Sequence, residues 1–102
     1  MSTDLRETLL NQLDTCTWGV LEPHFMRDAL FLIAHNICII DVAVAVADDH
    51  TDSVQSWLSS GLMKRPTLEL VKTWKQNPDK KYQVIIVSPY VLIQELNRAD
   101  LN

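Results

Sequence analysis

The longest apolar stretch covers residues 29–47 (ALFLIAHNICIIDVAVAVA) and indicates where the centre of the protein lies. It holds no Lys, Arg, Gly or Pro, and its strongly polar residues are His35, Asn36 and Asp41. Residues 30–34 are continuously apolar, which is typical of a buried strand. The Ala-rich part predicts a buried helix over about 38–48, because Ala favours helices and is depleted in strands. His35-Asn36 is then the break between the two elements.

Apolar residues at helical spacing predict further helices along the chain. The predicted ranges are about 4–15, a segment after Thr15 or Thr17 that contains Pro23, 51–60 and 68–77. Thr51 and Thr67 are candidate N-caps, since a Thr hydroxyl can accept a bond from the first turn of a helix. Gly61 stands where a C-terminal cap residue is expected.

Three more apolar segments predict strands, at 62–65, 82–87 and 90–96. We interpret 90–96 as a strand rather than a helix, and as an edge strand, because Pro89 commonly marks an edge or a bulge. The result is an α+β fold with about five helices packed on a small sheet of three or four strands. The length of 102 residues and the hydrophobic content of 47% predict a single domain over 1–102.

The apolar stretch is just long enough to raise the question of a membrane span. Asn36 and Asp41 would then lie near the middle of the bilayer, at a cost of a few kcal/mol for Asp alone. We therefore expect no membrane association. The N-terminal residues MSTDLRETLL are acidic and polar and do not resemble a secretory signal, which predicts a cytoplasmic protein. No cofactor motif is present, and we expect no cofactor.

Charge is unevenly distributed along the chain, whose net charge is −4. Residues 1–60 hold two basic residues against nine carboxylates, and residues 61–102 hold seven against four. This asymmetry is consistent with two solvated faces of different sign, and also with head-to-tail self-association into a homo-oligomer.

Residues 38–60 predict a helix-turn-helix-like pair, followed by the basic strand with Lys64 and Arg65. This order resembles the helix-turn-helix and wing of excisionase-like winged DNA-binding domains. Gln55 on the second helix could read an adenine. That helix carries no Lys or Arg, and the nearby carboxylates of Asp48, Asp49 and Asp52 would face phosphate. The charge pattern thus disfavours nucleic acid as a partner.

Basic residues gather in the second half of the chain, beside Trp74 and Tyr82. Such a zone is a candidate face for single-stranded nucleic acid or a protein partner, although lysines at helical spacing are also typical of a solvated face. Gln55, on the second helix of the helix-turn-helix-like pair, is included in this candidate face. The face then comprises Gln55, Lys64, Arg65, Lys72 and Lys75.

Four acidic residues and one histidine form the other candidate site. The sequence does not identify a metal for it. Asp41, Asp48, Asp49, His50 and Asp52 could supply ligands to a hard cation, but they do not match the EF-hand order. If Asp41 is buried, it needs a partner, for which the candidates are His24, His35 and Arg27. If it lies near the surface, it is an ordinary capping or ion-paired carboxylate.

Three segments, DVAVAVADD, VQSWLSSGLMKRPT and VIIVSPYVLIQEL, occur in this order and carry a family resemblance. The chain from about Trp18 to Glu95 resembles a small bacterial single-domain family of unknown function, and its most specific piece is the C-terminal PYVLIQE-type motif. The resemblance implies a bacterial, cytosolic protein. It implies no substrate, cofactor or catalytic residue.

The preferred hypothesis is a non-enzymatic protein-interaction or self-associating module, with Pro89 and Tyr90 at the candidate interface. The alternative is a winged-helix-like nucleic-acid-binding protein. A third hypothesis, a metal-assisted enzyme, requires that Asp41, Asp48, Asp49 and His50 converge; no catalytic residue is assigned from the sequence.

Overall fold

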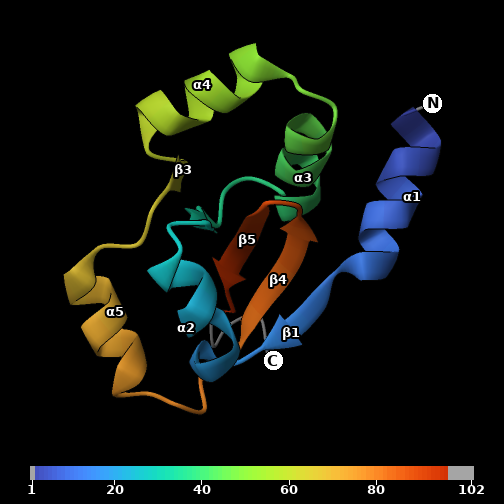
Figure 1. Cartoon of the computed structure of the whole chain (residues 1–102). Coiled ribbons are helices and arrows are strands. Elements are labelled where there is room, and N and C mark those ends of the chain that lie inside the picture. The colour runs from blue at the N-terminus through green and yellow to red at the C-terminus, as the bar shows by residue number, and fades with distance from the viewer. Residues whose placement is uncertain (1, 97–102) are drawn as a thin grey trace.

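The structure is a computed structural model that describes the backbone of residues 2–96 and the side chains of residues 5–96. Its helices are α1 (Ser2–Gln12), α2 (Trp18–Met26), α3 (Ile39–Ala47), α4 (Thr51–Ser60) and α5 (Leu68–Lys75). Its strands are β1 (Asp14–Cys16), β2 (Leu30–Ile33), β3 (Met63–Lys64), β4 (Tyr82–Val87) and β5 (Tyr90–Glu95). The predicted α+β class is confirmed (Figure 1).

The five strands form one mixed sheet in the order β1-β4-β5-β2-β3. Antiparallel pairs join β1 to β4, β4 to β5 and β2 to β3, whereas β2 and β5 run parallel. The prediction of an edge strand after Pro89 is wrong, because β5 lies in the middle of the sheet with β4 and β2 on either side. Pro89 precedes the strand, in the turn from β4, so it removes no donor from the ladder.

Helices cover both faces of this sheet, and alternate strand residues divide the core into two parts (Figure 1). Phe31, Ile33 and Leu92 face the side of α1 and α3. Leu30 and Leu32, with their neighbours on β5, face the side of α2 and α5. Because successive strand residues point to opposite faces, the unbroken apolar run of β2 is what a strand between two helical layers requires.

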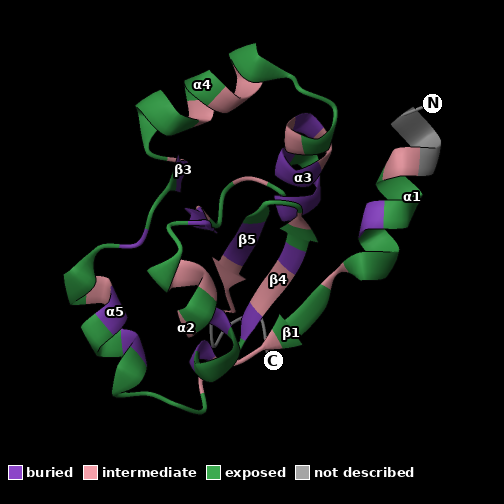
Figure 2. Cartoon of the chain, in the orientation of Figure 1, coloured by how far each residue is buried: buried purple, intermediate pink, exposed green. Residues whose placement is uncertain are grey.

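Helix α4 differs from the other helices in its burial. It carries no buried residue, as Figure 2 shows, although Val54 and Trp57 are packed against the core beside α3. Leu58, on the same helix, is 42% exposed. The apolar side of α4 is therefore only partly covered by the chain itself.

Two sharp turns position α4. Asp49 adopts a positive φ of 56° between α3 and α4, and Gly61 ends α4 with a φ of 82°, the left-handed conformation that glycine tolerates. His50, not the predicted Thr51, is the N-cap residue of α4. The other predicted cap is confirmed, because the Leu70 amide donates to the Thr67 hydroxyl at 3.1 Å.

The remaining differences lie near the first helix. α1 ends at Gln12 rather than near residue 15, and the residues after it form β1, which the sequence did not predict. The sheet thus has five strands instead of three or four. Among the described residues, no helix is both long and apolar enough to cross a membrane.

Candidate functional site

A pocket of about 260 Å³ lies along α4, between this helix, the end of α3 and the adjoining ends of β2, β3 and β5. Its floor consists of the apolar side chains of Phe31, Ala45 and Met63, all of which are buried. Val54 and Leu58 line it from α4. The register of β2 and β3 explains how the floor forms, because Met63 pairs with Ile33 and so reaches the same face of the sheet as Phe31.

Aromatic and basic groups flank the apolar floor. The rings of Phe31 and Tyr90 pack edge to face, with their centroids 5.7 Å apart. The guanidinium carbon of Arg65 lies 5.5 Å from the centroid of the Phe31 ring. Such a cation–π contact holds the charge beside the apolar surface. Arg65 also forms a long ion pair with Asp28, at 4.0 Å.

The opposite end of the pocket is formed by the turn between α3 and α4. Asp49, His50 and Thr51 line this end. His50 Nε2 lies 3.1 Å from Asp48 Oδ2, so the imidazole and that carboxylate are already paired. The pocket therefore has a basic end at Arg65 and an acidic turn at the start of α4.

Several residues predicted from the sequence come together in this pocket. Those that line it are Asp49, His50, Gln55, Arg65 and Tyr90, and Pro89 lies next to Tyr90 in the chain. The remaining basic candidates do not line it. Lys64 and Lys72 are exposed elsewhere, and Lys75 forms an ion pair with Glu22 at 3.2 Å.

The acidic candidates do not gather into one site. Asp41 is about half exposed and accepts a hydrogen bond from Arg6 Nη1 of α1 at 2.6 Å, so none of the three predicted partners holds it. The same contact raises the pKa of Arg6. Asp52 is exposed and does not line the pocket. Within residues 5–96, no group of three or more His, Cys, Asp or Glu side chains is placed to hold a metal ion.

The floor of the pocket is what sequence reasoning missed. Phe31, Ala45 and Met63 are apolar residues in apolar elements, and their pattern predicts core positions only. A signal was available in the predicted strand 62–65, because Met63 and Arg65 are two residues apart and so share a face in an extended chain. An Arg on the same face as a buried Met indicates where the apolar core ends and a charged, exposed surface begins.

Comparisons with known proteins agree with this fold. The sequence profile of a family described as "Protein of unknown function (DUF2288)" matches residues 4–95. The chain belongs to this family. A comparison with curated proteins gave no match. The PYVLIQE segment lies within the matched range, and its value as a family signature stays a prediction.

One solved structure resembles the chain, the NMR solution structure of PA1075 from Pseudomonas aeruginosa. It is 30% identical in sequence, with a TM-score of 0.78, and the match covers 89% of this chain and 83% of that one. The similarity supports the arrangement of helices and strands in this DUF2288 chain. It carries no statement of activity, substrate or partner.

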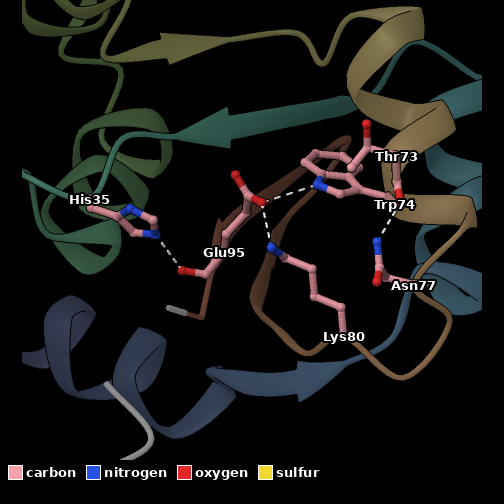
Figure 3. A network of polar contacts seen from close by, with 6 residues as sticks. All are labelled: His35, Thr73, Trp74, Asn77, Lys80 and Glu95. Atoms are coloured by element: carbon pink, nitrogen blue, oxygen red, sulfur yellow. Dashed lines mark hydrogen bonds and ion pairs between the residues drawn. The ribbon is translucent and has the colours of Figure 1, made fainter. Parts of the chain in front are cut away.

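A second polar cluster of the DUF2288 chain surrounds Glu95 at the end of β5 (Figure 3). The Glu95 carboxylate accepts a hydrogen bond from Trp74 Nε1 at 3.1 Å and pairs with Lys80 Nζ at 2.8 Å, while His35 contacts the Glu95 carbonyl. These groups satisfy one another and tie α5 and the residues after β2 to the end of β5. The cluster is accordingly explained by the fold.

Proposed function

We propose that the protein is a non-enzymatic interaction module that binds a partner protein by accepting one apolar side chain of the partner into the α4 pocket. The observation that carries this proposal is the apolar floor of Phe31, Ala45 and Met63 beneath a helix without buried residues. An anchor side chain placed there would cover the exposed part of Leu58. Burial of an apolar group in such a pocket is what dominates the energetics of many protein interfaces.

The α4 pocket measures about 260 Å³, which is large enough to admit one apolar side chain of a partner. Its neighbours also fit an interface, because aromatic residues and Arg are enriched among the residues that contribute most to binding. Tyr90 and Arg65 are of these types, and both are partly exposed at the pocket.

A peptide selection with two matched variants tests the proposal. A random peptide library displayed on phage is selected on the wild-type protein, and the affinity of an enriched peptide is measured by fluorescence anisotropy. Leu58→Asp puts a carboxylate at the pocket, and Leu10→Asp makes the same change on α1, outside it. The two leucines are 42% and 49% exposed, and each is the third residue from the end of its helix.

We expect the enriched peptides to share an apolar residue and Leu58→Asp to weaken their binding by roughly tenfold or more, as for a central interface residue. Leu10→Asp should leave binding unchanged, and circular dichroism should show both variants folded. The proposal is refuted if no peptide is enriched, or if both variants bind the peptides as the wild type does.

A further inference from the structure

We infer that the partner segment carries a carboxylate next to its apolar anchor, and that Arg65 binds this carboxylate. The inference rests on the proposed function and adds the chemistry of the partner. It starts from the position of Arg65, which lines the pocket and lies over the ring of Phe31, one of the residues of its floor. A group bound by this guanidinium therefore lies directly beside an anchor that contacts Phe31.

Arg65 keeps hydrogen-bonding capacity for such a group. In the described part of the chain, its recorded contacts are the Phe31 ring and Asp28, whose carboxylate oxygen is 4.0 Å away. This distance exceeds that of a hydrogen bond, about 2.7–3.2 Å, and both side chains are more than half exposed. A guanidinium presents its donors as a planar fork that matches a carboxylate with two parallel bonds.

The other end of the pocket fixes where the carboxylate must lie. Asp49 belongs to the turn before α4, whereas Arg65 follows the strand after it. The acidic and basic groups therefore line the pocket from different segments of the chain. A carboxylate would be repelled at the Asp49 end, where Asp48 adds a second carboxylate paired with His50. Attraction and repulsion both place it at Arg65.

Two blocked peptides that differ in one group test this inference. Acetyl-Gly-Phe-Asp-Gly-amide and acetyl-Gly-Phe-Asn-Gly-amide carry the same anchor, and the second lacks only the charge. Both are titrated into the ¹⁵N-labelled protein, and dissociation constants are obtained from the amide shifts of residues 45–58 and 63–65. We expect the Asp peptide to bind about fivefold more tightly, the upper range for an exposed ion pair.

Two arginine variants separate local binding from overall charge. Arg65→Gln should abolish the preference for the Asp peptide while leaving the Asn peptide bound as before. Arg27→Gln makes the same change in net charge at an exposed arginine that contacts His24 and does not line the pocket, so the preference should persist. Equal affinity of both peptides for the wild type, or loss of the preference in Arg27→Gln, refutes the inference.

The same titrations keep the two proposals distinguishable. If both peptides shift the pocket amides equally, the inference fails and the interaction module stands. If neither peptide shifts them at millimolar concentration, the proposed function itself fails. A third probe, 3-phenylpropionate, has the same ring and carboxylate without a peptide backbone. Its tighter binding would mean that a small acid is the occupant, which would overturn the assignment to a partner protein.

Discussion

Gln94 holds the turn that leads into α3, and its replacement tests how much this turn contributes to stability. Its side-chain amide donates to the carbonyl oxygens of Ala34 and Ile37, at 2.7 and 2.8 Å. It thereby links the central strand β5 to the turn between β2 and α3. In Gln94→Leu both bonds are lost, and each is worth about 1 kcal/mol net. We expect a loss of about 2 kcal/mol in the free energy of unfolding, or roughly 8–16 °C in Tm.

The variant Gln94→Glu tests the same geometry through pH. A carboxylate cannot donate to two carbonyl oxygens, so the charged form is disfavoured and the pKa of the new carboxyl is raised above about 4.3 in the folded protein. The pKa of this carboxyl is then higher in the folded protein than in the unfolded chain. Stability is therefore retained below pH 4, where the carboxyl is protonated in both states, and is lost as the pH rises through the pKa of the folded protein. The protonated carboxyl has one O–H and can donate to only one of the two carbonyl oxygens. Gln94→Glu should therefore be less stable than the wild type by about 1 kcal/mol at acidic pH, the value of one lost bond, and by more at neutral pH.

Gln83 provides the matched control for both variants. It lies directly opposite Gln94 in the β4–β5 register and is similarly half-buried, but no side-chain hydrogen bond of Gln83 is recorded within the described residues. The assay is urea unfolding followed by tryptophan fluorescence. Gln83→Leu and Gln83→Glu should have much smaller effects. If Gln94→Leu and Gln83→Leu share one midpoint, the two carbonyl bonds do not stabilise the turn.

Two further predictions concern Tyr82 and Asp41. The Tyr82 hydroxyl is buried without a hydrogen-bond partner among the described residues, so Tyr82→Phe should raise stability by up to about 1 kcal/mol in urea unfolding; a clear loss would contradict this. Burial, and then Glu95, raise the pKa of Tyr82 above 10.0, so wild-type stability should persist below pH 10 and fall above it, more steeply than in Tyr82→Phe. Asp41→Asn removes the exposed pair with Arg6 and should barely change the urea midpoint; a loss as large as that of Gln94→Leu would refute a surface role.

Local pattern predicted most elements of this fold and could not predict how they pair. The apolar segment 82–87 is a strand with the predicted ends, and Gly61 ends a helix as predicted. β1 was missed because Asp14, Thr15 and Cys16 show no apolar alternation; they form a strand because β4 offers them a hydrogen-bonding edge. The parallel pairing of β2 with β5 joins segments about sixty residues apart, and no local signal encodes it.

The same limit explains why the pattern of charge along the sequence does not show which side chains meet. Asp41 and Asp48 are seven residues apart and so share a helix face, yet each carboxylate is paired with a different neighbour, Arg6 and His50. The packing of α1 against α3 gives Asp41 a partner that its neighbours in the sequence do not reveal. The pocket arises from the opposite effect, because β2–β3 pairing brings Phe31 beside Arg65 from distant segments. Under the proposed function, the residues that bind the partner lie where an apolar strand face meets a charged side chain, and not where charges cluster along the sequence.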